Sequence, residues 1–232
     1  TNYVAHVMGS GTTFPNGCVD FSLCDSSALF ILGIGINDMA ASGFTLTQFN
    51  TDYIATLNFL KLAGYTMQNI ICMGITYANS SLHSTYNQST AVLQNSIIQA
   101  AAQQYGAIYV PTIDLWTNSV ATLTATGGNS GGNTMTFAST SGLTAGMSVS
   151  GTGTNSSAVG YTYILSVNSA TQITLSNNLT ANASGSYVFS HLDPGDGIHP
   201  TPSGHLLMAK RIVSILSGTL RRKVNALSNF NN

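Results

Sequence analysis

The sequence is poor in charged residues and contains no glutamate. Only 6% of its 232 residues are charged, and all seven acidic residues are aspartates. Any carboxylate chemistry must therefore use aspartate. The formal net charge is −1, so the chain lacks the surplus of basic residues that is typical of proteins that bind nucleic acid or anionic membranes. We therefore expect neither nucleic acid nor a membrane as a partner.

Cysteine is scarce, and long apolar runs are absent. Cys72 lies in a short apolar run and is expected to be buried, whereas Cys18 and Cys24 are close enough in sequence to form a disulfide that spacing alone cannot establish. No stretch is long enough to cross a membrane, and no signal peptide is visible. The abundance of Thr, Ser, Asn and Gly favours an extracellular protein or a virion component.

The first half of the chain alternates predicted strands with predicted helices. Strands are predicted at residues 3–8, in the apolar run that starts at residue 28, and at residues 69–74 and 107–110. Helices are predicted at residues 47–63 and 84–105, the second with Leu93, Ile97 and Ala101 inward. Strands that alternate with helices at this spacing predict an α/β fold, with a parallel sheet covered on both faces.

The pattern changes in the second half. No residue from 115 to 192 is charged, and no helical period is present. Short alternating apolar runs separated by Gly-Gly, Ser-Gly and Asn-Asn turns predict small antiparallel β structure instead. We interpret residues 119–190 as a β-rich domain inserted into an α/β core formed by residues 1–118 and 191–218. A long decorated loop is the alternative.

The end of the chain predicts one more helix. It should begin at Pro202, a good first-turn residue, and end at residue 217, with Gly218 as its stop. Residues 219–232 then form a polar tail.

Two short motifs carry the candidate chemistry. Asp196 and His199 stand three residues apart in a Gly/Pro-rich stretch that leads into the last predicted helix. On a loop, this spacing lets the carboxylate bind one imidazole nitrogen while the other nitrogen faces a cleft, as in a catalytic triad. Upstream, the apolar strand from residue 28 ends in Gly35-Ile36-Asn37-Asp38.

Two other interpretations of the Asp/His stretch are open. Asp196 can stabilise a turn beside a structural histidine. Alternatively, four potential ligands crowd one loop and could bind a metal ion, although this mixture without cysteine is a weak metal signal; they are His191, Asp193, Asp196 and His199. We expect neither a metal nor an organic cofactor.

The Gly-x-Asn-Asp and Asp-x-x-His motifs, in this order, resemble those of the SGNH (GDSL-type) esterase family. The resemblance covers about residues 3–117 and 191–217 and implies a three-layer α/β/α, flavodoxin-like fold. It implies that His199 is the general base and that Asp196 orients it. It further implies that the Asn37 amide and the N–H of Gly11, or of Gly9 as an alternative, stabilise an oxyanion. Gly35 and Asp38 would support that loop.

One part of the family pattern is missing. The nucleophilic serine, which the family carries in a Gly-Asp-Ser block on its first strand, has no counterpart here. A strand–helix–strand unit takes roughly 30 residues, and only ten residues precede Gly11. The resemblance therefore predicts that the first strand and the serine come from an upstream segment or a partner chain.

The expected function follows from this resemblance. We expect a serine ester hydrolase that removes O-acetyl groups from a surface polysaccharide, because the β-rich segment is also similar to modules of phage tail proteins. The alternative is a non-catalytic tail protein or adhesin that binds a receptor or glycan and retains the fold. For either function we expect a homo-oligomer, with a trimer as one possible form.

Overall fold

The computed structural model describes residues 29–82, 84–115 and 121–229, with side chains as far as residue 218. It divides into two compact units. Unit 1 consists of Thr1–Thr76 and Thr85–Ile113, and unit 2 consists of Tyr77–Ser84 and Asp114–Asn232. The predicted strand at residues 3–8, the candidate oxyanion residue Gly11, and the cysteines 18 and 24 lie outside the described residues.

Unit 1 contains a parallel sheet with the strand order β1-β2-β3. The strands are β1 (Phe30–Leu32), β2 (Ile70–Met73) and β3 (Ile108–Val110). The central strand β2 is buried along its whole length, as expected for a strand covered on both faces. Cys72, on this strand, is buried with a free thiol, as its apolar surroundings predicted. The predicted α/β fold with a parallel sheet is confirmed.

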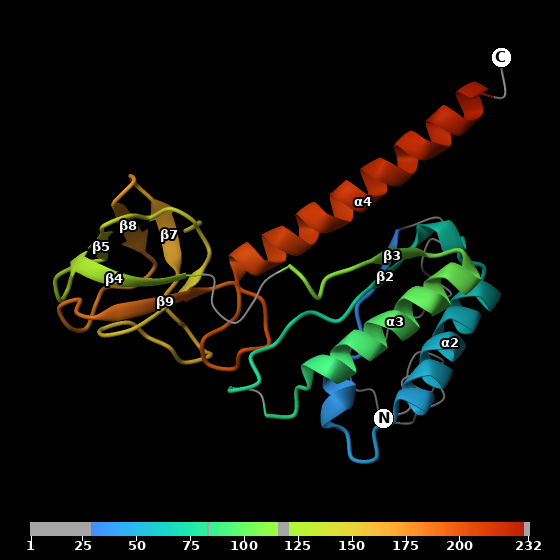
Figure 1. Ribbon diagram of the computed structural model, residues 1–232, viewed down its shortest axis with the longest axis horizontal. Helices are drawn as coiled ribbons and strands as arrows, with labels where there is room; N and C mark the ends of the chain where they lie inside the picture. Colours follow the sequence, from blue (N-terminus) through green and yellow to red (C-terminus); the bar gives the residue numbers. More distant parts are fainter. Residues whose placement is uncertain (1–28, 83, 116–120, 230–232) are drawn as a thin grey trace. The chain divides into compact units, whose positions relative to one another are not determined.

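Two helices of unit 1, α2 (Leu46–Leu62) and α3 (Gln88–Tyr105), pack against each other, and α3 also packs against β2 and β3 (Figure 1). Both helices begin with a side-chain cap. Thr45 Oγ1 accepts the Gln48 N–H at 3.1 Å, and Asn87 Oδ1 accepts the Thr90 N–H at 2.9 Å. Such caps satisfy N–H groups that the helix itself leaves unpaired.

The buried face of α3 differs from the prediction. Ala101 is buried, but Leu93 is 52% exposed, while Gln94 and Asn95 are turned inward. The apolar periodicity predicted the wrong buried face at this end of the helix, because the two inward amides make hydrogen bonds to the backbone rather than apolar contacts. They hold the ends of two strands, as described below. Helix α3 is therefore both a packing element and a polar support.

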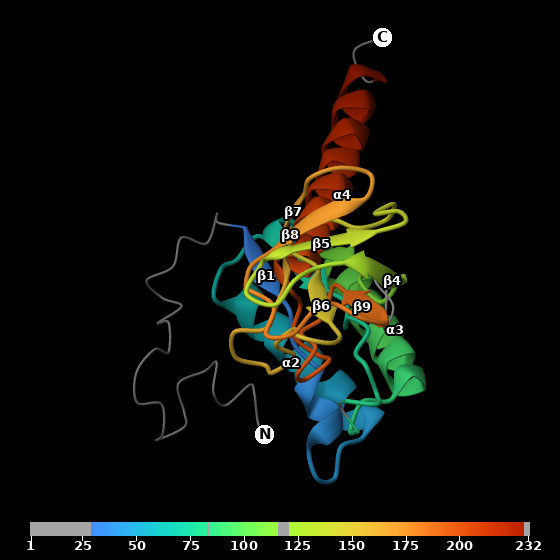
Figure 2. The same cartoon turned by 90° about the vertical axis from the view of Figure 1, so that its left-hand side faces the viewer.

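Unit 2 contains a six-stranded antiparallel sheet with the order β6-β9-β4-β5-β8-β7. Its strands are β4 (Ala121–Gly127), β5 (Thr134–Phe137), β6 (Ser148–Ser150), β7 (Ile164–Val167), β8 (Gln172–Leu175) and β9 (Ser186–Ser190). The first and last strands, β4 and β9, lie side by side (Figures 1 and 2). The ends of this segment therefore meet, as they must if it is inserted into another fold.

The six-stranded sheet has a hydrophobic core of its own. Phe137 packs edge-on against Phe189, with ring centroids 5.5 Å apart. The other members of this core are Met135, Leu143, Met147, Val149, Ile164, Ile173, Leu175, Leu179 and Tyr187. All are almost fully buried, so this part of the chain has the apolar interior that an independently folding unit needs. Its separability stays a prediction.

The last helix, α4 (Pro202–Asn229), begins at Pro202 as predicted, but it runs well past Gly218. The predicted stop is wrong because Gly218 does not adopt the left-handed conformation of a C-terminal glycine. Residues 219–229 are therefore helical rather than an irregular tail. None of the described helices is long and apolar enough to cross a lipid bilayer.

Candidate active site

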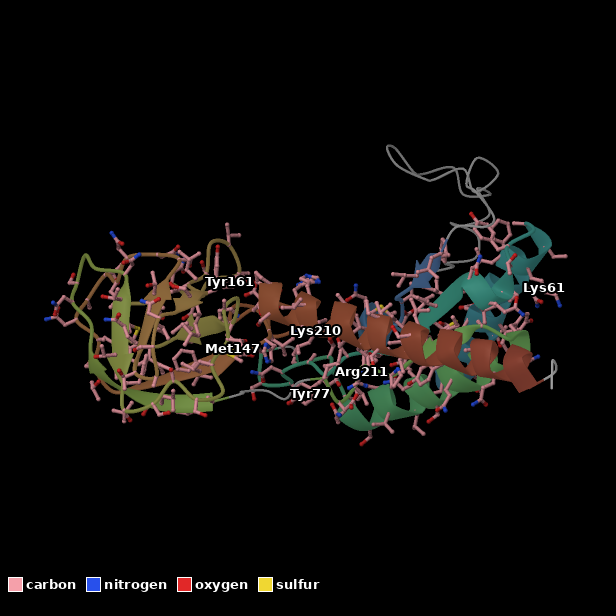
Figure 3. All side chains as sticks on the ribbon, turned by 90° about the horizontal axis from the view of Figure 1, so that it is seen from above. Lys61, Tyr77, Met147, Tyr161, Lys210 and Arg211 are labelled. Atoms are coloured by element: carbon pink, nitrogen blue, oxygen red, sulfur yellow. The ribbon has the colours of Figure 1, made fainter. Side chains whose placement is uncertain are left out.

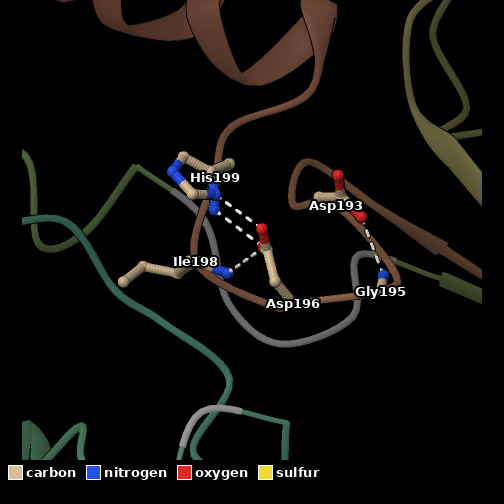
Figure 4. Close-up of polar contacts among 5 residues, drawn as sticks. All are labelled: Asp193, Gly195, Asp196, Ile198 and His199. Atoms are coloured by element: carbon tan, nitrogen blue, oxygen red, sulfur yellow. Dashed lines mark hydrogen bonds and ion pairs between the residues drawn. The ribbon is translucent and has the colours of Figure 1, made fainter. Parts of the chain in front are cut away.

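Asp196 and His199 form a hydrogen-bonded pair on the loop that precedes α4. Residues 192–201 are called the Asp/His loop below. His199 Nδ1 lies 2.5 Å from Asp196 Oδ2 (Figure 4). The other carboxylate oxygen, Oδ1, accepts the backbone N–H groups of Ile198 at 2.9 Å and His199 at 3.1 Å. The sequence spacing predicted this contact, and the structure contains it.

The surroundings of Asp196 favour its ionised form. Burial raises the pKa of this carboxyl, but the His199 ring and the two backbone N–H groups outweigh burial and hold the pKa below its usual range. In the neutral imidazole, an ionised carboxylate holds the ring proton on Nδ1, which leaves the lone pair on Nε2. The His199 side chain is 76% exposed. Nε2 is therefore available to take a proton from another molecule or segment.

Backbone hydrogen bonds hold the Asp/His loop in its bent shape. The Asp193 N–H donates to the His199 carbonyl, and the Gly197 N–H donates to the Asp193 carbonyl, both at 2.8 Å. Gly197 has a φ of 68°, in the left-handed region, and a Cβ there would lie 2.8 Å from Asn79 Cβ. Asn79 also donates its N–H to the Gly197 carbonyl at 2.7 Å. Only glycine fits this turn without strain.

His191 and Asp193 have local structural partners. His191 Nδ1 lies 2.7 Å from Ser203 Oγ, and burial lowers the pKa of the imidazole, so it stays neutral. Asp193 Oδ1 accepts the Gly195 N–H at 2.7 Å (Figure 4). Burial raises the pKa of Asp193, opposed by that hydrogen bond. Within residues 29–82, 84–115 and 121–229, no three His, Cys or Asp side chains are grouped so that they could hold a metal ion.

The Gly-x-Asn-Asp motif forms a tight turn at the end of β1. Gly35 has a φ of 119°, and Asn37 begins the short 3₁₀ helix η2 (Asn37–Ala40). The Asn37 side chain is exposed and makes no hydrogen bond to any described residue. This turn borders a hollow of about 320 Å³. The residues that line it are Gly33, Ile34, Gly35, Ile36, Asn37, Asp38 and Ala41. An amide in this position can donate to a ligand oxygen.

Two residues that the sequence interpretation missed support the strand ends. Gln94 is fully buried, and its Nε2 donates to the Gly35 carbonyl at 3.0 Å. Asn95 Oδ1 accepts the Ile75 N–H at 2.7 Å, and its Nδ2 donates to the Ile75 carbonyl at 3.0 Å. Consecutive amides of α3 thus hold the turns that follow β1 and β2. The only sequence signal was a pair of amides in a helix.

The structure groups the predicted site residues in two sets. Asp196 and His199 are joined in unit 2, whereas Gly35, Asn37 and Asp38 share one turn of unit 1. Within that turn, the Asp38 N–H donates to the Gly35 carbonyl at 3.3 Å, so Asp38 helps to shape the turn. The meeting of the two sets in one site stays a prediction, as do the catalytic roles.

Comparison with known proteins gives one finding. A family model described as GDSL-like lipase/acylhydrolase matches residues 19–212. Searches among curated proteins and among solved structures gave no match. The matched region spans more than half of the chain and includes both the Gly-x-Asn-Asp and the Asp-x-x-His motifs. The chain therefore belongs to the GDSL-like lipase/acylhydrolase family, a family of ester hydrolases.

Proposed function

We propose that the chain acts as a serine ester hydrolase in which His199 is the general base and Asp196 its orienting partner. The hydrogen bond between His199 Nδ1 and Asp196 Oδ2 is the observation that carries this proposal. His199 Nε2 takes the proton of a serine hydroxyl as that oxygen attacks the ester carbonyl. Asp196 then stabilises the imidazolium, which returns the proton to the departing alcohol. Water releases the acyl group by the same route.

The oxyanion is stabilised by the turn after β1. The exposed Asn37 amide and the N–H of Gly11 donate to the carbonyl oxygen as negative charge develops on it. One donor of this type is worth about 3 kcal/mol in the transition state. Gly35 and Asp38 hold the turn in the shape that presents Asn37. The proposal requires that the two sets of residues meet when substrate is bound.

The nucleophile comes from outside residues 1–232, in an upstream segment or a partner chain. The sequence contains no Gly-Asp-Ser block. Ser203, which lies close to a histidine, is buried and bonds to His191 rather than to His199. Because Ser203 bonds to His191, His199 is not placed to take its proton, so this buried hydroxyl does not serve as the nucleophile.

The substrate we propose is an O-acetyl group on a surface polysaccharide, and the setting is the cell surface or a virion tail. The β-rich, charge-free segment of residues 115–192 and the overall composition support this assignment. The competing function is a non-catalytic receptor- or glycan-binding tail protein or adhesin. The absence of the serine block favours that alternative, and the intact Asp196–His199 pair favours the hydrolase.

The test is hydrolysis of an aryl acetate by the chain together with the segment that supplies the serine. His199→Ala should lower kcat/KM by about 10³-fold or more, and Asp196→Asn should also lower it strongly. His205→Ala is the matched control, because His205 is exposed at the start of α4 and lies outside the proposed site. A His199→Ala variant as active as the His205→Ala variant would refute the hydrolase proposal. Strong activity of residues 1–232 alone would place the serine within this chain.

A further inference from the structure

A pair of tyrosines stands on one side of an extended segment that leads into β7. Tyr161 and Tyr163 are partly exposed, and their rings are in edge-to-face contact with centroids 6.2 Å apart. Thr162, between them, is buried, and its Oγ1 accepts the Asn155 N–H at 2.9 Å. In an extended chain, alternate side chains point to the same side. The buried threonine therefore fixes both rings outward.

This segment is held against the Asp/His loop. Gly195 belongs to the Asp/His loop, and Ala158 lies three residues before Tyr161. A Cβ on Gly195 would collide with the backbone nitrogen of Ala158, so the two backbones are in direct contact. Ser148, which is bridged to Tyr163, donates its Oγ to the Leu192 carbonyl at 2.8 Å. Both contacts lie within unit 2, so they place the tyrosine segment beside the Asp/His loop.

The tyrosine ring itself is within electrostatic reach of that loop. Burial raises the pKa of Tyr161, and the charges of Asp193 and Asp196 raise it further. Figure 3 shows Tyr161 on the side of the six-stranded sheet from which α4 begins, which is where the Asp/His loop lies. A ligand at His199 that extends toward the sheet therefore meets an aromatic surface.

The chemistry of this surface selects a class of ligand. No residue from 115 to 192 is charged, and the segment supplies tyrosine, serine, threonine and asparagine side chains. Without a cation, this segment lacks the charge-assisted hydrogen bonds that bind a phosphate or carboxylate strongly. Aromatic faces with surrounding hydroxyl and amide groups suit a ligand that is apolar on one face and hydroxylated at its rim. A neutral sugar ring has both properties.

We propose that Tyr161 and Tyr163 form a subsite that binds a neutral sugar ring of the ester substrate beside the Asp196–His199 pair. This inference rests on the proposed ester hydrolase and narrows its substrate to uncharged acylated saccharides. The sugar stacks on the exposed tyrosine faces, which places its acyl group toward His199. Tyr161 and Tyr163 thus determine specificity, because an aryl acetate has no sugar ring to use the subsite.

The first experiment measures binding, so it does not depend on the serine. Calorimetry of the full chain uses partly O-acetylated xylotetraose as the neutral probe and an O-acetylated sialyl oligosaccharide as the anionic one. Tyr161→Ala should weaken binding of the neutral probe by about tenfold or more, and Tyr161→Phe, which keeps the ring, by less than about threefold. Two controls should bind as the unmodified chain does: Leu165→Ala, at an exposed position of β7, and Tyr105→Ala in unit 1.

The outcomes separate this inference from the hydrolase proposal. Binding of the neutral probe that is equal in the unmodified chain, Tyr161→Ala and Tyr163→Ala would overturn the subsite, and so would a preference for the anionic probe. Aryl acetate hydrolysis without any saccharide binding would leave the hydrolase intact and overturn the subsite. In the opposite case, ring-dependent saccharide binding, with no ester hydrolysis even when the segment that supplies the serine is present, would support the subsite and refute the hydrolase.

Discussion

Replacing Gln94 with methionine should slow ester hydrolysis without lowering the stability of the protein. Gln94 is fully buried on α3, and its one hydrogen bond to the part of the chain that the structure describes runs from Nε2 to the Gly35 carbonyl at 3.0 Å. Its Oε1 atom is buried and has no hydrogen-bond partner among the described residues. Methionine has a similar length and volume, so the variant removes both amide groups without opening a cavity.

The two free-energy terms of this substitution have opposite signs. Loss of the hydrogen bond costs about 1 kcal/mol, whereas removal of a buried unpaired oxygen recovers about 1–3 kcal/mol. The free energy of unfolding should therefore stay the same or rise. Among the described residues, the Gly35 carbonyl, however, keeps only the weaker 3.3 Å hydrogen bond from the Asp38 N–H, so the turn that carries Asn37 loses its link to α3. Because small displacements of a catalytic donor are costly, kcat should fall by about 10–100-fold with little change in KM.

The assay combines aryl acetate kinetics with chemical denaturation. Gln99→Met is the matched control, since Gln99 lies on the exposed face of the same helix. The variant Gln94→Glu tests the same hydrogen bond through pH. A protonated carboxyl can donate to the Gly35 carbonyl and an ionised one cannot. The activity of this variant relative to the unmodified enzyme should therefore improve as the pH falls. The reasoning is refuted if Gln94→Met keeps full kcat, or if it loses stability in proportion to activity.

Two further changes test the Asp/His loop and the attachment of α4. Gly197→Ala should destabilise the protein by about 1–3 kcal/mol, because its φ is 68° and its Cβ would crowd Asn79; Gly185→Ala, with a φ of 72° but open space, should cost less in the same thermal unfolding measurement. Asp114→Asn should cost less than about 1 kcal/mol, since the bidentate pair with Arg211 is largely exposed. Hydrogen bonding from Arg211 lowers the pKa of Asp114, so the stabilisation is present above about pH 4 and is lost as the pH falls through the folded-state pKa. A difference in the free energy of unfolding between Asp114→Asn and the unmodified protein that persists at pH 2 would contradict this account.

The local parts of the site were predictable from the sequence. Asp196 and His199 are three residues apart, and a turn of that length brings their side chains together whatever surrounds it. The strands β1, β2 and β3 were found because short continuous apolar runs are typical of the strands of a parallel sheet. In both cases the information lies within a few consecutive residues.

The supporting residues could not be found in this way. Gln94 bonds to a carbonyl 59 residues away, and Asn95 to a backbone group 20 residues away, so only the folded chain shows that these amides face inward. The place of Tyr161 beside the Asp/His loop likewise depends on how the six-stranded sheet packs. Gly218 gave the opposite error: it predicted a helix end where α4 continues, because a glycine permits a helix end without requiring one.

The six-stranded sheet offers a test of whether residues 119–190 form an inserted domain. Ala121 on β4 pairs with Phe189 on β9, so a short Gly-Ser linker can join the flanks after deletion. Since the sheet encloses its own core, the deleted chain should keep the helical circular dichroism and cooperative unfolding of unit 1.

In the full chain, two core substitutions examine the same independence without a deletion. Phe189→Ala should cost about 3–5 kcal/mol in the six-stranded sheet, and Ile98→Ala about 2–5 kcal/mol in α3 of unit 1. If the sheet folds by itself, each substitution lowers the midpoint temperature of a different unfolding transition. Hydrogen exchange can assign each transition to the strands of the sheet or to the helices of unit 1. If either substitution lowers both transitions together, or if the deletion abolishes cooperative unfolding, the sheet is part of one continuous core. Residues 119–190 would then be a long segment of a single domain rather than an inserted domain, because their apolar side chains would stabilise the α/β part of the chain as well as the sheet.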